Sequence, residues 1–118
     1  MPRVKSNVAR NKRKKKIMDA AKGYFGGRSK LYRIAKNRVE KSWEHAYRGR
    51  KQKKRDFRKL WIQRINAASR QHDMPYSQFI HGLDEAGVEL NRKVLADLAV
   101  REPEAFAELV RVARDQLD

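Results

Sequence analysis

The residues best suited to chemistry in this sequence are lysines and arginines, which crowd its first half. Residues 1–56 hold 21 Lys+Arg and 4 Asp+Glu, a net charge of +17. Residues 57–118 hold 9 Lys+Arg and 10 Asp+Glu, a net charge of −1. Both cations neutralise phosphates and release counterions, and Arg also pairs with phosphate through two N–H groups and stacks on bases. The whole chain of 118 residues carries a net charge of +16, so we expect a polyanionic partner.

We predict that the chain binds nucleic acid through two sets of residues. In the first half the set is Arg3, Lys5, Arg10, Lys12, Arg13, Lys14, Lys15, Lys16, Lys22, Arg28, Lys30, Tyr32, Arg33, Lys36, Arg38, Lys41, Arg48, Arg50, Lys51, Lys53, Lys54 and Arg55. In the second half it is Arg58, Lys59, Arg64, Asn66, Arg70, Arg92 and Lys93, with Gln63 and Ser69 as further hydrogen-bonding groups. The second set favours recognition of a folded RNA by shape and base edges, and the alternative is an ordinary polar surface.

Five aromatic residues are interleaved with the charge in the first half. They are Tyr24, Phe25, Tyr32, Trp43 and Tyr47. Aromatic rings beside cations can stack on unpaired bases, and the same rings at helical spacing can instead pack on a neighbouring protein or helix.

The sequence gives no sign of catalysis or of a cofactor. His45, His72 and His81 have no partner at metal-ligand spacing, and cysteine is absent. No glycine-rich phosphate loop or zinc-protease motif occurs, so we expect no enzyme activity, no metal and no small-molecule substrate. No apolar run approaches the roughly 18 residues of a membrane span, so we expect no membrane partner. No apolar segment follows the basic N-terminus, so we expect no secretory signal peptide.

Residues 1–28 are expected to form a basic arm. Pro2 disfavours an early helix, and five consecutive cations at 12–16 favour disorder or a nucleic-acid-binding tail. Residues 17–22 are predicted to form a short helix. Three glycines at 23, 26 and 27 then predict a hinge.

Residues 29–72 are expected to form one long helix, basic as far as residue 56, with Ser29 as its N-cap. A narrow apolar stripe recurs every four residues at Leu31, Ala35, Val39, Trp43 and Tyr47. The stripe has no evident partner in the chain, so we expect the helix to need stabilisation from outside. Gly49 is a candidate position for a bend.

Residues 57–118 are expected to form a small all-helical domain whose first helix continues the long one. Met74–Pro75 is predicted to end that helix, Ser77 and Asn91 to cap two short helices, Gly87 to close the first of these, and Pro103 to begin the last. The predicted core is Phe57, Trp61, Ile65, Phe79, Leu83, Leu95, Leu98, Phe106, Leu109 and Val110. The predicted fold class is therefore all-α.

Several segments resemble one protein family along essentially the whole chain. They are PRVK at 2–5, AKGYF at 21–25, LY at 31–32, DFRKLWIQRINAA at 56–68, YSQFIHGL at 76–83 and NRKVLADLAV at 91–100. This pattern is similar to the L-twenty family of bacterial large-subunit ribosomal proteins.

The resemblance implies a protein that binds large-subunit (23S) ribosomal RNA, promotes early subunit assembly and lies beside the ribosomal protein L-twenty-one. It also implies possible repression of the protein's own messenger RNA. Asp84 and Glu85 stand where the family commonly has Lys, so we expect no RNA contacts at 79–89. Without the resemblance, the basic half alone would also suit a general nucleic-acid chaperone or a DNA-compacting protein.

Overall fold

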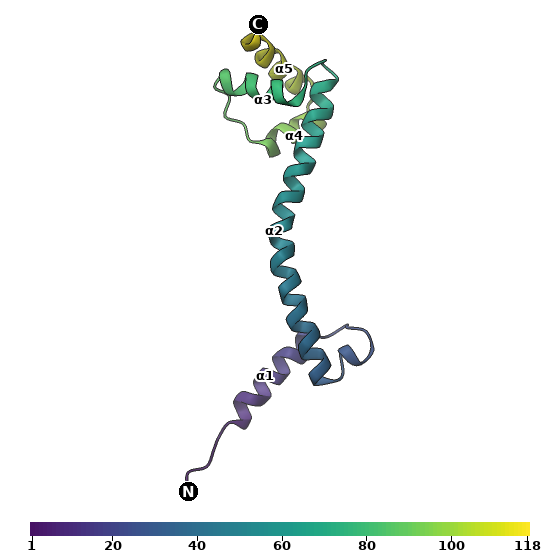
Figure 1. Ribbon diagram of the computed structural model, residues 1–118, viewed down its shortest axis with the longest axis vertical. Helices are drawn as coiled ribbons and strands as arrows, with labels where there is room; N and C mark the ends of the chain where they lie inside the picture. The colour runs from purple at the N-terminus through teal and green to yellow at the C-terminus, as the bar shows by residue number, and fades with distance from the viewer. The chain divides into compact units, whose positions relative to one another are not determined.

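The computed structural model describes residues 1–118 and contains helices only, which confirms the predicted all-α class (Figure 1). The chain divides into an N-terminal unit, 1–51, and a C-terminal unit, 52–118. In chain order the elements are the helix α1 (Asn7–Ala20), the 3-10 turn η1 (Gly26–Arg28) and the helices α2 (Tyr32–Arg70), α3 (Tyr76–Glu85), α4 (Arg92–Arg101) and α5 (Pro103–Leu117). The boundary between the two units falls inside α2.

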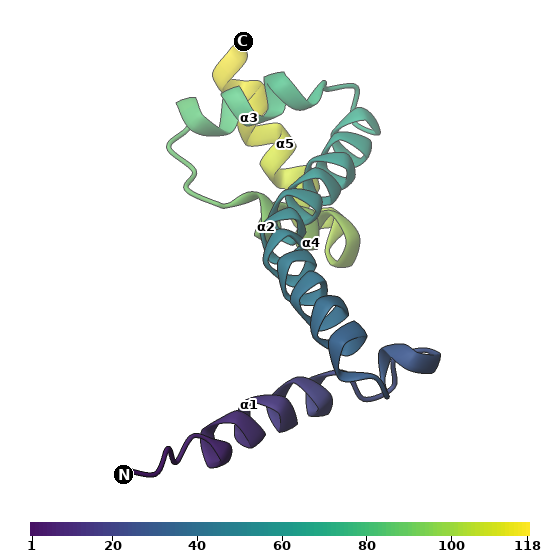
Figure 2. The same ribbon diagram turned by 60° about the horizontal axis from the view of Figure 1, so that its bottom comes forward.

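The N-terminal unit has a small core of its own, in which Ile17 and Ala21 meet Ala35 and Val39 of α2. Figure 2 shows α1 and η1 beside the beginning of α2. The spacing of four residues places each pair on one face of its helix, so the two faces can pack together. The prediction that the stripe on α2 has no partner in the chain is therefore wrong at Ala35 and Val39. Farther along the same stripe, Trp43 and Tyr47 are exposed.

The helix α1 begins at Asn7, well before the predicted start at Ile17. Lys and Arg are good helix formers, and no Gly or Pro interrupts residues 7–22, so local propensity favours the helix through the charged run. The backbone leaves the helical conformation at Gly23, whose φ is +86°. Residues 12–16 are therefore helical in the structure, which differs from the expected disorder.

The helix α2 begins at Tyr32 and ends at Arg70, inside the predicted range. Ser29 does not cap it, because the helix begins three residues later, and the Ser29 hydroxyl instead donates a hydrogen bond to the Gly26 carbonyl of η1, 3.0 Å away. The helix continues through Gly49, where no atom outside the local helix backbone would lie within 4 Å of an added Cβ.

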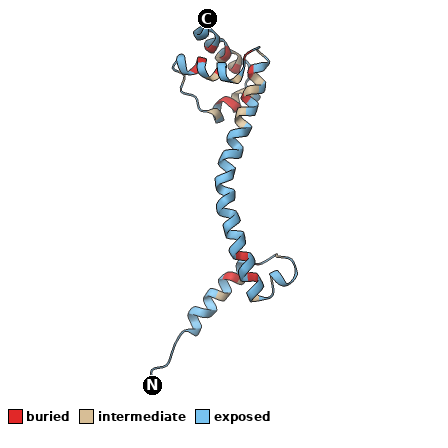
Figure 3. Cartoon of the chain, viewed as in Figure 1, coloured by how far each residue is buried: buried red, intermediate tan, exposed pale blue.

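The core of the C-terminal unit lies between α3, α4, α5 and the last turns of α2 (Figure 3). Its buried residues are Ile65, Met74, Phe79, Leu83, Leu95, Ala96, Phe106, Val110 and Ala113. Phe79 and Phe106 meet at its centre, with ring centroids 5.0 Å apart. Trp61 and Leu109 are half-buried against this core, and Leu98 is half-buried in α4.

Phe57 differs from its prediction, because its side chain is 45% exposed and lies outside the core. It sits one helical turn before Trp61, and their ring centroids are 6.2 Å apart. The core side of α2 therefore starts at Trp61. Met74 and Ala96 are buried although they were not predicted to be.

Three predicted helix ends are confirmed in the C-terminal unit, and one is wrong. The Asn91 side chain accepts a hydrogen bond from the Val94 N–H at 2.9 Å, and Pro103 stands in the first turn of α5. Ser77 lies inside α3, which has Pro75 at its N-cap. At the other end, Gly87 has a φ of +73° and lets the Val88 N–H reach the Leu83 carbonyl, as the predicted closure requires.

Candidate nucleic-acid interface

The N-terminal unit carries positive charge with very little compensation. It holds 18 Lys+Arg and 3 Asp+Glu, and only Lys22 and Lys41 lie in ion pairs. Lys22 is 3.5 Å from Asp19 and Lys41 is 3.1 Å from Glu44. Every Lys and Arg of this unit is exposed except Lys14, which is half-buried. The predicted first-half contacts are thus accessible to a phosphate backbone.

Two of these cations lie over aromatic rings of their own chain. The Lys14 ammonium is 5.4 Å from the centroid of the Tyr32 ring, and the Lys51 ammonium is 4.5 Å from that of Tyr47. Such pairs gain from attraction between the cation and the ring face. They also occupy one face of each ring, which leaves Tyr24, Phe25 and Trp43 as the aromatics with no cation over them.

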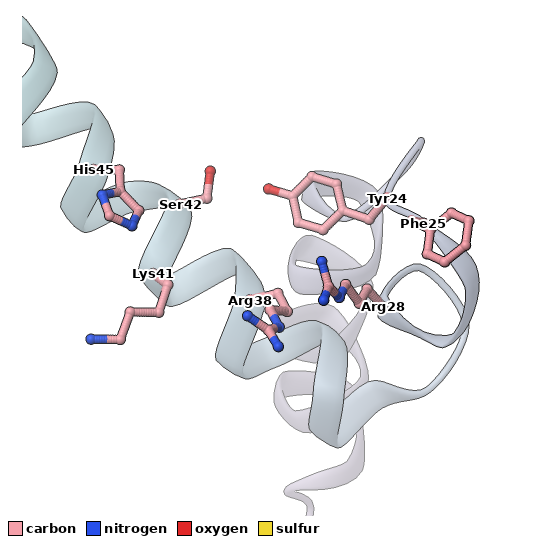
Figure 4. Close-up of a pocket in the computed structure, with 7 residues that line it drawn as sticks. All are labelled: Tyr24, Phe25, Arg28, Arg38, Lys41, Ser42 and His45. Atoms are coloured by element: carbon pink, nitrogen blue, oxygen red, sulfur yellow. The ribbon is translucent and has the colours of Figure 1, made fainter.

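A pocket of about 490 Å³ lies within the N-terminal unit, between the segment 24–28 and α2 (Figure 4). Its lining side chains are Tyr24, Phe25, Arg28, Arg38, Lys41, Ser42 and His45. Figure 4 shows the Arg28 side chain extending toward α2, which carries Arg38, and the Tyr24 hydroxyl pointing toward α2 near Ser42. The pocket therefore combines cations, an aromatic face and small polar groups.

The cations in this pocket differ in whether they already have a carboxylate partner. Arg28 and Arg38 make no ion pair, whereas Lys41 donates a hydrogen bond to Glu44. That hydrogen bond and the charge of Lys41 lower the pKa of the Glu44 carboxyl below its ordinary value, so this carboxylate stays ionised. The two arginines are therefore the cations most open to an external anion.

Sequence reasoning found part of this pocket. The sequence predicts Arg28, Arg38 and Lys41 as contacts and Tyr24 and Phe25 as stacking candidates, but it assigns no role to Ser42 or His45. The spacing 38, 41, 42 and 45 places these four side chains on one face of a helix, which the sequence does contain. The position of Tyr24 opposite that face depends on the fold of residues 21–31.

In the C-terminal unit, several predicted contacts are held by neighbouring side chains. The Arg70 Nε donates to the Asn66 Oδ1 at 3.0 Å, and the Arg92 Nε donates to the Tyr76 hydroxyl at 2.8 Å. These bonds fix two guanidinium groups in place and leave their other N–H groups available. Ser69 is fully buried and donates a hydrogen bond to the Asn66 carbonyl. It therefore cannot contact RNA, and its predicted role as a hydrogen-bonding group is wrong.

A second groove, of about 560 Å³, lies between the end of α2 and α4. Trp61 and Arg64 line it from α2, and Lys93 and Arg101 line it from α4. Arg101 was not predicted, and its Nε is 3.0 Å from the Asp97 Oδ1, which offsets its charge. Arg58 and Lys59 are exposed but do not line this groove. The structure thus brings Arg64 and Lys93 together on one surface.

Other classes of site are not seen in the structure. No group of three or more His, Cys, Asp or Glu side chains is arranged to hold a metal ion. None of the helices combines the length and the apolar character needed to cross a bilayer.

Comparison with known proteins gives the family. A family model described as ribosomal protein L20 matches residues 3–109. The chain is 61% identical to the large ribosomal subunit protein bL20 of Nitratidesulfovibrio vulgaris (strain Miyazaki F), over 98% of this chain and 99% of that protein. It is 60% identical to bL20 of Carboxydothermus hydrogenoformans, over 99% of this chain and 100% of that protein. It is 53% identical to bL20 of Staphylococcus aureus (strain JH9), over 99% of this chain and 99% of that protein. The chain therefore belongs to the ribosomal protein L20 family, a family of bacterial large-subunit ribosomal proteins.

Proposed function

We propose that this chain binds large-subunit ribosomal RNA directly and promotes early assembly of the large subunit as a structural, non-catalytic component. The N-terminal unit supplies most of the affinity by neutralising phosphates of neighbouring RNA helices. The C-terminal unit supplies placement, because its folded core presents Arg64, Arg70 and Lys93 in fixed positions on a near-neutral body.

The observation that carries this proposal is the uncompensated charge of the N-terminal unit. Sixteen of its 18 Lys and Arg residues have no carboxylate partner, and nearly all are exposed. Exposed like charges repel one another, so a surface of this kind is most stable against a dense polyanion. Membership in the ribosomal family supports RNA as that polyanion.

A competition experiment tests RNA binding against the general nucleic-acid alternative. The whole chain is bound to labelled large-subunit ribosomal RNA on filters, and unlabelled ribosomal RNA or duplex DNA of equal nucleotide concentration is added. We expect the ribosomal RNA to compete at much lower concentration, because the C-terminal unit recognises a folded RNA. Equal competition by both polymers would favour a DNA-compacting or chaperone protein instead.

Two finer roles rest on the family resemblance. We expect the chain to lie beside the ribosomal protein L-twenty-one in the assembled subunit, which chemical crosslinking of purified large subunits would detect. We also expect it to bind its own messenger RNA. A reporter gene placed behind that messenger's leader should lose expression when the chain is overproduced, and unchanged expression would count against the repressor role.

A further inference from the structure

We propose that the pocket between the segment 24–28 and α2 binds one unpaired nucleotide of the RNA, with its phosphate between Arg28 and Arg38 and its base against Tyr24. This inference rests on the proposed function, because it assumes that the N-terminal unit meets RNA. It goes further by assigning a specific ligand, a nucleotide outside the helical stack, to a specific group of side chains.

The phosphate position follows from the two unpaired arginines. Arg28 comes from η1 and Arg38 from α2, and both line the pocket, with the Arg28 side chain extending toward α2 (Figure 4). Neither makes an ion pair, and no carboxylate lines the pocket. Two uncompensated guanidinium groups that line one pocket favour an anion there, and a phosphate can accept hydrogen bonds from both.

The base position follows from Tyr24, whose ring is half-buried and packs on the small core of the N-terminal unit. A ring held in this way loses little conformational freedom when a base stacks on it. Its hydroxyl points toward the α2 face that carries Ser42 and His45 (Figure 4). These polar groups can hydrogen-bond the edge of a base that lies on the ring. Phe25 is 87% exposed at the rim and turns away from the arginines in the same view.

The size of the pocket fits a single nucleotide. Its volume of about 490 Å³ lies within the range of roughly 300–1,000 Å³ typical of pockets for small ligands. A paired base has its faces covered by its neighbours in the stack, so only a bulged or looped-out nucleotide can offer a face to Tyr24. A duplex alone would reach the arginines and leave the ring unused.

The test compares two RNA hairpins that are identical except for one bulged uridine, each titrated with the full chain at fixed salt. We expect the chain to bind the bulged hairpin at least about fivefold more tightly, the lower end of what base stacking on an aromatic ring supplies. Tyr24→Leu and Arg38→Gln should each reduce this preference to near one. Tyr24→Phe retains the aromatic ring and should keep the preference for the bulged hairpin.

Arg33→Gln is the matched control, because Arg33 is an exposed cation of the same helix that does not line the pocket. It removes the same charge as Arg38→Gln and should weaken binding to both hairpins equally, leaving their ratio unchanged. Circular dichroism of each variant checks that the helices persist. Equal effects of Arg38→Gln and Arg33→Gln on the ratio would overturn the proposal.

A crosslinking experiment identifies the residues that lie against the bulged nucleotide. The bulged uridine is replaced by 4-thiouridine and irradiated in the complex, and we expect the crosslinked peptide to include residues 24–28 or 38–45. Crosslinks confined to other residues, or a wild-type chain with no preference for the bulge, would reject the pocket. Either result leaves the proposed function standing if ribosomal RNA still outcompetes duplex DNA, so the two failures are distinguishable.

Discussion

Gly82 of α3 lies directly against Ala113 of α5, so closely that no side chain fits between the two helices. A Cβ atom added to Gly82 would be 2.5 Å from the Ala113 carbonyl oxygen and 2.8 Å from the Ala113 Cβ. Both residues are buried, and α3 packs more extensively on α5 than on any other helix. The close approach brings Phe79 and Phe106 into contact at the centre of the core, and it depends on a residue without a side chain.

Gly82→Ala should therefore destabilise the C-terminal unit, although alanine is the better helix former. The new methyl group meets backbone, which cannot move aside as a flexible side chain would, so we expect a loss of about 1–3 kcal/mol in the free energy of unfolding. Urea denaturation followed by circular dichroism measures it. Gly49→Ala is the matched control: nothing lies within 4 Å of its Cβ, so it should leave stability unchanged or raise it by up to about 1 kcal/mol. A loss as large at Gly49 as at Gly82 would contradict the packing argument.

The two phenylalanines at the centre and at the edge of the bundle should behave very differently when truncated. Phe106 is fully buried against Phe79, so Phe106→Ala should cost about 3–5 kcal/mol and leave so small a domain largely unfolded. Phe57 is nearly half exposed, so Phe57→Ala should change the free energy of unfolding by less than about 1 kcal/mol. Urea titration of both variants checks the contrast, and comparable losses would place Phe57 in the core after all.

These residues also mark how far the sequence carries a fold prediction. The all-α class, the Asn91 cap, the turn at Gly87 and the start of α5 were predictable, because each depends on local propensity or capping chemistry. The exposure of Phe57 was not, since the apolar period continues along α2 past the end of the core. Gly82 was also missed, because the close approach of α5 is a property of two segments far apart in sequence.

The candidate interface, like the fold, was only partly predictable from the sequence. Composition alone predicted exposed cations, and all the predicted Lys and Arg contacts are exposed in the structure except Lys14 and Arg92, which are half-buried. The burial of Ser69 depends on packing that the helical period of α2 did not reveal. The core formed by Ile17, Ala21, Ala35 and Val39 likewise required the return of the chain through residues 21–31, which glycines make possible but do not specify.

That small core should hold α1 only weakly in the free chain. Like charges four residues apart in α1 destabilise it, and its packing involves only four buried side chains. We expect amide hydrogens of residues 7–20 to exchange rapidly in free protein at low salt and to gain protection when RNA is added. Amides of α3 and α5 should be protected in both states.

A pair of substitutions tests whether the core causes this protection. Val39→Asp buries a charge within the core, so α1 should stay unprotected even with RNA present. Trp43→Asp makes the same charge change at an exposed position of the same stripe and should leave the protection of α1 intact. Equal protection of α1 in both variants would show that RNA orders it without this packing.

The last prediction concerns how affinity divides between the two units. If the whole chain neutralises about 8–10 phosphates, the logarithm of its association constant for ribosomal RNA should fall with the logarithm of salt concentration at a slope near −6 to −9. The fragment 52–118 contains the whole larger core and should fold alone, yet it carries 12 Lys+Arg against 11 Asp+Glu. Its slope should therefore be shallower than about −3, with discrimination between a structured junction RNA and a scrambled control retained.

The fragment 1–51 provides the complementary measurement, because it carries 18 Lys+Arg against 3 Asp+Glu. It should bind both RNAs with a steep slope and little discrimination. Filter binding of the three proteins across a series of potassium chloride concentrations gives all the slopes. Discrimination found in 1–51 but not in 52–118 would reverse the roles proposed here. A whole-chain slope shallower than about −3 would mean that most of the exposed cations face water in the complex, since each neutralised phosphate contributes close to one unit of slope.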